Sequence, residues 1–340
     1  MHLSDLREQL QALGANPAHA ARVLRQWSRA LPMDEGRRRI EDFLPLRLRQ
    51  ALPQLQSQLQ GLVRLQSAHP GADGSQRLLL ALADGQQIEA VLLPPQGLCV
   101  STQVGCAVGC VFCMTGQGGV VRQLGSAEIV AQVVLARQRQ PVRRVVFMGM
   151  GEPAHNLDAV LEAIDVLGQE GGIGHKELVF STVGDPRVFT RLAQALVRPA
   201  LALSLHSGND ARRRQLLPRA PAVPVAELVE SADAYARATG YPLQVQWTLL
   251  EGINDGDDEV QALIGLLAGR HAVLNFIPWN HVEGLPFKRP SWERAAQMAR
   301  ALSRHGILTK LRRSAGQDVD GGCGQLRARA VVPRMQRRLP

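Results

Sequence analysis

Short β-prone runs alternate with amphipathic helical stretches from residue 97 to residue 306, and this alternation limits the fold more than any other feature of the chain. The β-prone runs are LCVSTQ, RRVVFMG, ELVFSTVG, ALALSLHS, LQVQWTLLEG and AVLNFIPWN, and a helical stretch follows each of them. ILTKLRR (307–313) can add one more strand. Repeated strand–helix units predict an α/β fold with a parallel sheet and right-handed crossovers. Six units suit a partial (βα)6 barrel, although a doubly wound sheet has the same pattern.

The residues before 97 divide into two parts. Up to about residue 60, apolar residues recur at spacings of three and four, as they do from Leu3 to Leu10, which predicts a small helical module. Farther on, two apolar runs flank Asp84-Gly85, a pattern typical of a β-hairpin. We therefore expect a helical, RNA-contacting module over 1–75, a linking hairpin over 76–95, an α/β core over 96–326 and a basic tail over 327–340.

The chain is strongly basic. It has 39 Lys and Arg against 30 Asp and Glu, a formal net charge of +9 and a pI of about 10.1. Such a charge attracts polyanions, and nucleic acid is the partner that it suggests, although a basic protein need not bind one. The basic residues are concentrated in segments 35–50, 210–215, 310–313 and 327–340. Because these segments are far apart in the sequence, they indicate a broad contact surface.

No segment has the features of a leader or of a membrane span. The N-terminus is charged and polar at helical spacing, and no window approaches about eighteen uninterrupted apolar residues. The five cysteines, four of them between residues 99 and 113, make a poor disulfide framework. We therefore expect a cytoplasmic protein without a membrane partner, whose thiols act as ligands or reagents.

The unusual residues of the core follow its predicted strands. In parallel α/β folds, ligands gather at the carboxyl ends of the strands. The segments found there are the cysteine loop, MGMGEP (148–153), STVG (181–184), SLHSGND (204–210) and IPWN (277–280). The pattern predicts one site on one rim of the sheet.

Three of the cysteines form a C-x3-C-x2-C motif, Cys106, Cys110 and Cys113. Thiolates on one short loop can converge on a metal centre, and soft sulfur ligands select zinc or iron–sulfur clusters. A closed zinc site needs a fourth ligand, and the loop contains no histidine. Three cysteines on a 4Fe-4S cluster leave one iron open to a small molecule. Three buried cysteines that merely fill space are the alternative without chemistry.

The cysteine motif, with an aromatic residue before its last cysteine, is similar to the signature of radical S-adenosylmethionine (radical SAM) enzymes. Together with GMGEP, SLH, IPWN and DVDGGCGQL, the stretch CVSTQVGCAVGCVFCMTG resembles the RlmN/Cfr family of adenine-methylating RNA enzymes. The resemblance runs from Glu89 to about Leu326. It implies a radical SAM barrel in which Cys106, Cys110 and Cys113 hold a 4Fe-4S cluster. The open iron would bind the amino and carboxylate groups of S-adenosylmethionine, and reduction would release a 5'-deoxyadenosyl radical.

The resemblance also assigns the residues that bind S-adenosylmethionine. They are Gly151, Glu152, Ser181, Ser204, Leu205, His206 and Asn280. A carboxylate suits an ammonium group, a glycine permits close backbone approach, and Ser and Asn can hydrogen-bond ribose hydroxyls. Ser181 as a helix cap and His206 as a satisfied rim histidine are the structural alternatives.

The remaining assignments concern Cys323, Cys99 and Glu89. The resemblance implies that Cys323 accepts a methyl group, which a second S-adenosylmethionine converts to a radical that adds to the base. Cys99 would then form a disulfide with Cys323 and release the product. Glu89 matches the family's proton-abstracting glutamate, although its sequence neighbours alone suggest an exposed hairpin residue. The glycines around Cys323 are typical of a flexible loop, as a mobile thiol requires.

The resemblance therefore implies an S-adenosylmethionine-dependent RNA methyltransferase that acts on rRNA and/or tRNA, at carbon 2 of adenine in preference to carbon 8. It also implies a monomer served by an electron donor such as flavodoxin or ferredoxin. Two alternatives stay open. A radical SAM enzyme with a small-molecule or protein substrate would need neither Cys99 nor Cys323. A zinc-stabilised RNA-binding protein would be colourless, whereas a 4Fe-4S protein is brown.

Overall fold

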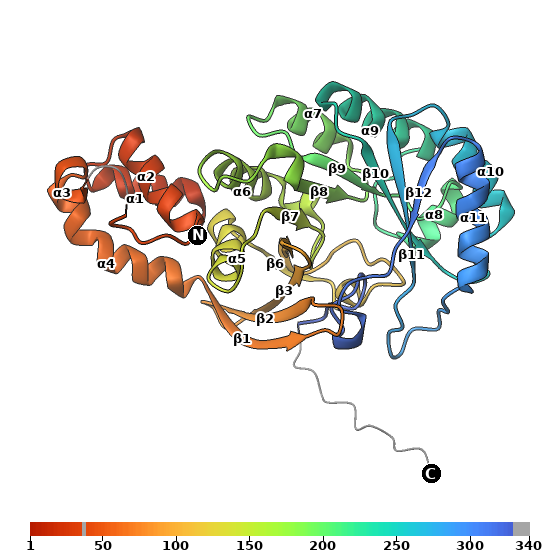
Figure 1. Cartoon of the computed structure of the whole chain (residues 1–340), viewed down its shortest axis with the longest axis horizontal. Helices are drawn as coiled ribbons and strands as arrows, with labels where there is room; N and C mark the ends of the chain where they lie inside the picture. The colour runs from red at the N-terminus through yellow and green to blue at the C-terminus, as the bar shows by residue number, and fades with distance from the viewer. Residues whose placement is uncertain (36–38, 329–340) are drawn as a thin grey trace, which may run out of the picture.

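The N-terminal part of the chain is helical, as predicted. The computed structural model describes residues 1–35 and 39–328 (Figure 1), so part of the basic segment 35–50 and most of the tail 327–340 lie outside the described residues. The helices are α1 (Leu3–Ala12), α2 (Pro17–Ser28), α3 (Ile40–Phe43) and α4 (Leu46–Gly61). Leu3, Leu6 and Leu10 are fully buried, which confirms the helical spacing read from the sequence. The backbone N–H of Leu3 donates to Ser126 Oγ at 2.7 Å and joins the module to the core.

A strand that the sequence analysis assigned to the helical module follows α4. Residues Val63–Pro70 form β1, which pairs antiparallel with β2 (Gln76–Leu82). The predicted hairpin is present, because β2 pairs with β3 (Gln87–Leu93) across Asp84-Gly85. The helical part of the 1–75 segment therefore ends at Gly61, and a three-stranded meander links it to the core (Figure 1).

The core is a ten-stranded sheet in the order β1-β2-β3-β4-β7-β8-β9-β10-β11-β12. From β4 onward all neighbours are parallel, as six strand–helix units predict, and β12 is the extra strand expected in ILTKLRR. The parallel strands are β4 (Gly97–Cys99), β7 (Arg144–Phe147), β8 (Leu178–Thr182), β9 (Ala200–Ser204), β10 (Leu243–Leu249), β11 (Ala272–Pro278) and β12 (Leu308–Leu311). In the described chain β12 pairs only with β11, so the partial barrel is open.

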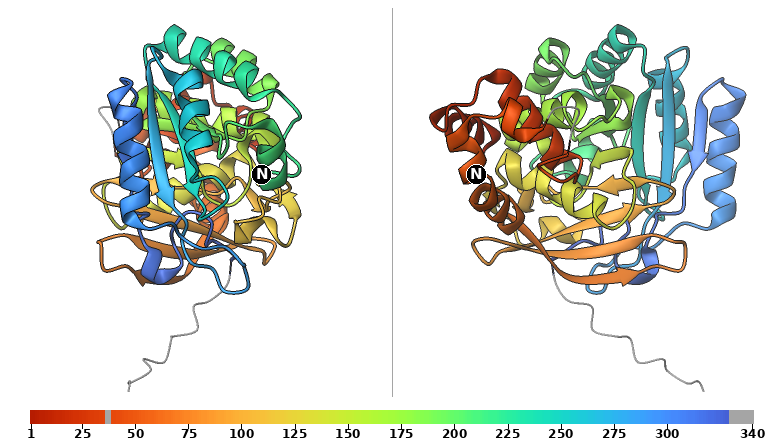
Figure 2. Two further views of the ribbon diagram at one scale, coloured as in Figure 1. Left: turned by 90° about the vertical axis from the view of Figure 1, so that its right-hand side faces the viewer. Right: turned by 60° about the vertical axis from the view of Figure 1, so that its left-hand side comes forward.

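Helices cover the outer face of the parallel strands (Figures 1 and 2). Their apolar faces and the outward side chains of the strands form the main core. The crossover helices are α5 (Ser126–Arg137), α6 (Leu157–Gln169), α7 (Pro186–Gln194), α8 (Asp210–Leu216), α9 (Val225–Thr239), α10 (Asp257–Leu267) and α11 (Trp292–Arg304). A small sheet of β5 (Gln103–Gly105) and β6 (Val120–Gln123) brackets the cysteine loop. No helix in the described residues is both long and apolar enough to cross a membrane.

Candidate active site

The predicted site residues lie at the carboxyl ends of the parallel strands, on one rim. Cys99 ends β4, Ser181 lies one residue before the end of β8, and Ser204 ends β9. The two serine hydroxyl oxygens are 3.5 Å apart. Asn280 follows β11 by two residues. The rim that the sequence pattern predicted is therefore present in the fold.

The cysteine loop brings three thiols toward one another. Cys106 is buried, Cys110 and Cys113 are half-buried, and all three are free thiols. Burial raises the pKa of Cys106 to about 12. Burial also raises the pKa of Cys110, and the charges of Cys113 and Cys106 add to that effect. The three thiols are therefore close enough for the charge of one to affect the pKa of another.

The residue types of the cysteine loop suit an iron–sulfur cluster. Across residues 1–35 and 39–328, no three His, Cys, Asp or Glu side chains are placed to hold one metal ion. A 4Fe-4S cluster needs no such convergence, because each cysteine binds a different iron. Metal binding would also offset the unfavourable burial of the thiolates, since it requires the thiols to lose their protons. The soft donor set of Cys106, Cys110 and Cys113 therefore fits an iron–sulfur cluster.

The segment that carries Cys323 packs directly against the cysteine loop. The N–H of Met114 donates to the carbonyl oxygen of Gly324 at 2.8 Å. Thr115 Oγ1 donates to the carbonyl oxygen of Leu326 at 2.7 Å. A Cβ added at Gly324 would lie 3.3 Å from the carbonyl oxygen of Phe112. Cys323 is thus placed on the same rim as the cysteine motif although more than two hundred residues separate them.

Cys99 and Cys323 are near each other but not bonded. All five cysteines are free, so the predicted Cys99–Cys323 disulfide is absent from this structure. Burial, together with a smaller effect of the charge of Cys323, raises the pKa of Cys99 to about 12. Cys323 is exposed, yet the protein around its sulfur displaces enough water to raise its pKa. A bond between the two thiols would require their oxidation.

Glu89 is fully buried, so the alternative of an exposed hairpin glutamate is wrong. The antiparallel pairing of β3 with β4 places it beside Ser101, whose hydroxyl donates to the Glu89 carbonyl oxygen at 2.5 Å. Its carboxylate forms an ion pair with buried Arg77. Its other oxygen accepts the N–H groups of Arg327 at 2.8 Å and Ala328 at 3.1 Å. Burial raises the pKa of Glu89, while Arg77 lowers it.

Gly151 and Glu152 form a tight loop after β7. Gly151 has φ +103°, and an added Cβ would lie 2.7 Å from Cβ of Gln103. Only glycine fits this position without displacement. The carboxylate of Glu152 accepts the N–H groups of Ala154 at 3.1 Å and Val183 at 3.0 Å. Burial raises the pKa of Glu152 to about 7.

His206 is a buried neutral histidine at the end of β9. Its Nδ1 accepts the N–H of Thr248 at 2.9 Å, which leaves the ring proton on Nε2. Burial lowers the pKa of His206 to about 3. Its ring meets Phe112 edge to face at 4.9 Å between centroids, which ties the cysteine loop to β9. The Leu205 side chain packs in the main core, so only its backbone remains available to a ligand.

Two residues that lie at this site, Arg213 and Ser314, were not predicted from the sequence. Arg213 is buried on α8. The charges of Cys110, in the cysteine loop, and of Glu152 both act on its guanidinium. Its spacing of three and four from Leu216 and Leu217, both apolar, could have predicted this burial. Ser314 accepts a hydrogen bond from Asn280 Nδ2 at 2.9 Å. No signal in the sequence marked Ser314.

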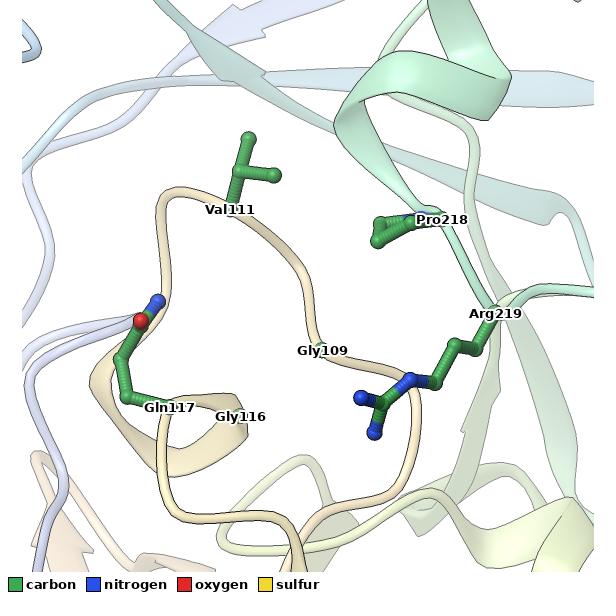
Figure 3. Close-up of a pocket in the computed structure, with 6 residues that line it drawn as sticks. All are labelled: Gly109, Val111, Gly116, Gln117, Pro218 and Arg219. Carbon is green, nitrogen blue, oxygen red and sulfur yellow. The ribbon is translucent and has the colours of Figure 1, made fainter.

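A hollow of about 270 Å³ lies beside the cysteine loop, between it and the segment that follows α8. Figure 3 shows Gly109 of the loop between the side chains of Gln117 and Arg219. Arg219 Nη1 donates to the carbonyl oxygen of Ala107 at 3.4 Å. The residues that line it include none of the predicted S-adenosylmethionine-binding residues.

Comparison with known proteins agrees with the geometry. The family model of the Radical SAM superfamily matches residues 100–264. A probable RNA methyltransferase of Methylibium petroleiphilum is 67% identical over 97% of this chain and 94% of its own length. One of Pseudomonas aeruginosa is 61% identical over 100% of this chain and 99% of its own length. The crystal structure of a radical SAM methyltransferase from Sphaerobacter thermophilus is 35% identical, with a TM-score of 0.84 over 97% of this chain and 98% of that one.

The chain belongs to the radical SAM methyltransferases. The C-x3-C-x2-C motif follows β4, the first of the parallel strands, and lies within the residues that the family model matches. The open barrel and its polar rim are the architecture that this superfamily implies for a 4Fe-4S cluster and S-adenosylmethionine.

Proposed function

We propose that this radical SAM methyltransferase methylates a ring carbon of adenine in rRNA and/or tRNA, at carbon 2 rather than carbon 8. The methyl group would pass through Cys323, as the resemblance to the RlmN/Cfr family implies. The observation that carries the proposal is the packing of the Cys323 segment on the cysteine loop, through the Met114–Gly324 hydrogen bond. The names of the curated relatives and the basic charge of the chain support RNA as the substrate.

The cysteine motif, Glu152 and Cys323 have separate parts in this proposal. Cys106, Cys110 and Cys113 would hold the cluster, and Glu152 would bind the ammonium group of S-adenosylmethionine. When bound, the cluster and S-adenosylmethionine supply one-electron chemistry and the methyl group. The protein must then turn the Cys323 thiol into a nucleophile. A hydrogen bond from Ser314 and the charge of Arg312 both oppose the raised pKa of Cys323, and both therefore favour the thiolate.

Glu89 and Cys99 would complete the reaction. Glu89 would remove the proton from the methylated ring carbon, a task that suits a carboxylate whose pKa burial raises. The N–H groups of Arg327 and Ala328 occupy one of its oxygens here and would have to leave first. Once the adduct radical has returned one electron to the proposed cluster, the Cys99 thiolate would attack the sulfur of Cys323. The new S–S bond would replace the bond from that sulfur to the methylene carbon, whose electron pair would stay on that carbon, and a proton would complete the methyl group of the product.

The reaction also needs a source of electrons. We propose a cytoplasmic monomer that receives electrons from a small acidic carrier such as flavodoxin or ferredoxin. The hollow beside the cysteine loop supports the acidic carrier, because exposed Arg219 lines it and Gly109 of the loop is only half-buried there (Figure 3). An acidic carrier would be attracted to this basic residue.

The proposal is tested with full-length protein that has been reconstituted with iron and sulfide without oxygen. The protein is incubated with RNA, a one-electron reductant and methyl-labelled S-adenosylmethionine, and modified adenosines are mapped by mass spectrometry. We expect label in 2-methyladenosine, and none after Cys323→Ala at unchanged iron content. Cys99→Ala is expected to accumulate RNA covalently bound to protein.

Other results would point to other functions. A colourless protein that binds zinc but no iron would favour a zinc-stabilised RNA-binding protein. Cleavage of S-adenosylmethionine that is indifferent to RNA and to Cys323→Ala would favour a radical enzyme with another substrate. Either result overturns the proposed function.

A further inference from the structure

Arg213 is a buried cation that the proposed reaction does not yet use. It lies on α8, seven residues after His206, and only 4% of its surface is exposed. Burial lowers its pKa, while the acidic groups of Asp210, Cys110 and Glu152 act in the opposite direction. Two of these three groups belong to the predicted cofactor site. A positive charge has thus been placed beside the site at a considerable desolvation cost.

Val183 fixes how Arg213 is placed relative to Glu152. The backbone N–H of Val183 donates to Glu152 Oε2 at 3.0 Å. The carbonyl oxygen of the same residue accepts a hydrogen bond from Arg213 Nη2. The Glu152 carboxylate and the Arg213 guanidinium are therefore held by the N–H and the carbonyl group of the same residue, at the carboxyl end of β8. They form no ion pair with each other among the described residues.

The guanidinium of Arg213 keeps unused donors. Nε is buried and has no hydrogen-bond partner, and the bond to Val183 is the only one that the group makes to the described residues. Its neighbour Arg212 differs, because it is paired with Asp258 at 2.9 Å and Glu259 at 2.5 Å. A buried guanidinium without a carboxylate partner is rare unless an anion binds it.

We infer that Arg213 binds the α-carboxylate of S-adenosylmethionine, opposite Glu152, which binds the α-ammonium group. The amino acid part of S-adenosylmethionine carries an ammonium and a carboxylate group on one carbon atom. The site offers the two complementary groups, the Glu152 carboxylate and the Arg213 guanidinium, both bound to Val183. A planar guanidinium with free donors matches a carboxylate. The thiol of Cys110 lies close enough to interact with Arg213, so a carboxylate held there would also lie near the cluster. This inference rests on the proposed use of S-adenosylmethionine at the cysteine loop.

The test measures binding rather than turnover. Equilibrium dialysis of the reconstituted full chain, without RNA or reductant, gives the affinity for S-adenosylmethionine and for decarboxylated S-adenosylmethionine. Arg213→Gln should weaken binding of the first about 10- to 100-fold, the range for a lost charge-assisted hydrogen bond. It should change binding of the decarboxylated compound less than about threefold, because that ligand lacks the group in question. Arg213→Lys should give an intermediate loss for the first ligand only.

Arg214→Gln is the matched control, because Arg214 is exposed on the same helix. It should bind both ligands as the unaltered protein does. Iron content and the thermal midpoint are measured for every variant, and Arg213→Lys carries the comparison if Arg213→Gln does not fold. If Arg213→Gln weakened the binding of both ligands equally, Arg213 would act on the fold or the cluster, and the inference would be overturned. Unchanged binding of both ligands would also overturn it. If the unaltered protein bound no S-adenosylmethionine, the proposed function itself would fail.

Discussion

Asn280 Nδ2 donates to the carbonyl oxygen of Cys323 at 2.9 Å, which fixes the distant cysteine to the end of β11. The same nitrogen donates to Ser314 Oγ at 2.9 Å. A Cβ added at Gly322 would lie 2.7 Å from this nitrogen, so the segment comes very close to the amide. The resemblance implied that Asn280 binds S-adenosylmethionine. In this structure it anchors the Cys323 segment, and its role in binding S-adenosylmethionine stays a prediction.

Replacing Asn280 should loosen that segment. Asn280→Ala removes the two hydrogen bonds that its amide nitrogen donates to this segment, of roughly 0.5–1.5 kcal/mol each. Amide hydrogen exchange across residues 314–326 should therefore accelerate by about 5- to 100-fold. Ser314→Ala removes only one of the two bonds and should have a smaller effect. Mass-spectrometric exchange on the ligand-free protein checks this, and unchanged rates in Asn280→Ala would show that other contacts hold the segment.

Gly151 should not tolerate even one methyl group. Gly151→Ala places a Cβ 2.7 Å from Gln103 at a φ of +103°, so either the backbone or the neighbouring strand must shift. We expect a loss of about 1–3 kcal/mol in the free energy of unfolding. Gly265→Ala is the matched control, since Gly265 is inside α10 and has no atom within 4 Å of an added Cβ. This control should gain up to about 1 kcal/mol from helix propensity. If Gly151→Ala and Gly265→Ala changed the free energy of unfolding in urea by the same amount, Gly151 would not be a strained position.

The parallel sheet could be predicted because its signal is local. Each strand is a short apolar run followed by a helix of period 3.6, and the rule for ligands at carboxyl ends then locates the rim. Strand β1 was missed because VRLQSAHP mixes polar and apolar residues, and only its pairing with β2 makes it a strand. The end of the first core strand at Cys99 depends likewise on tertiary contacts.

The side-chain environments could not be read from the sequence. Glu89 stands near glutamines in a hairpin, and its burial follows from the pairing of β3 with β4 and from Arg77 on β2. Arg213 is one of three consecutive arginines, and the fold buries only this one. Such differences arise from contacts between residues far apart in the chain, which periodicity does not encode.

Breaking the buried ion pair should destabilise the protein strongly. Arg77→Met leaves the Glu89 carboxylate buried without its cation, which typically costs about 3–5 kcal/mol. Adding Glu89→Gln removes the uncompensated charge, so the double variant should recover part of that loss. Urea unfolding of both variants shows whether the double variant has the larger free energy of unfolding. If the double variant were no more stable than Arg77→Met, the charge of Glu89 would not be the source of the cost.

The affinity for S-adenosylmethionine should rise with pH through the pKa of Glu152. Because burial raises that pKa to about 7, the carboxyl is mostly protonated at pH 6 and mostly ionised at pH 7.5. Only the ionised form attracts the ammonium group of the ligand, so binding should tighten roughly five- to tenfold over this range. His206 does not contribute, since a pKa of about 3 keeps it neutral throughout.

Glu152→Gln supplies the control for this pH dependence. The amide cannot ionise, so the variant should bind weakly at both pH values and lose the rise that belongs to Glu152. Any titration of the ligand itself appears equally in both proteins and cancels in the ratio of their dissociation constants. Equilibrium dialysis at pH 6 and pH 7.5 provides that ratio. A pH dependence that persists unchanged in Glu152→Gln would assign the titration to another group and remove Glu152 from the ammonium site.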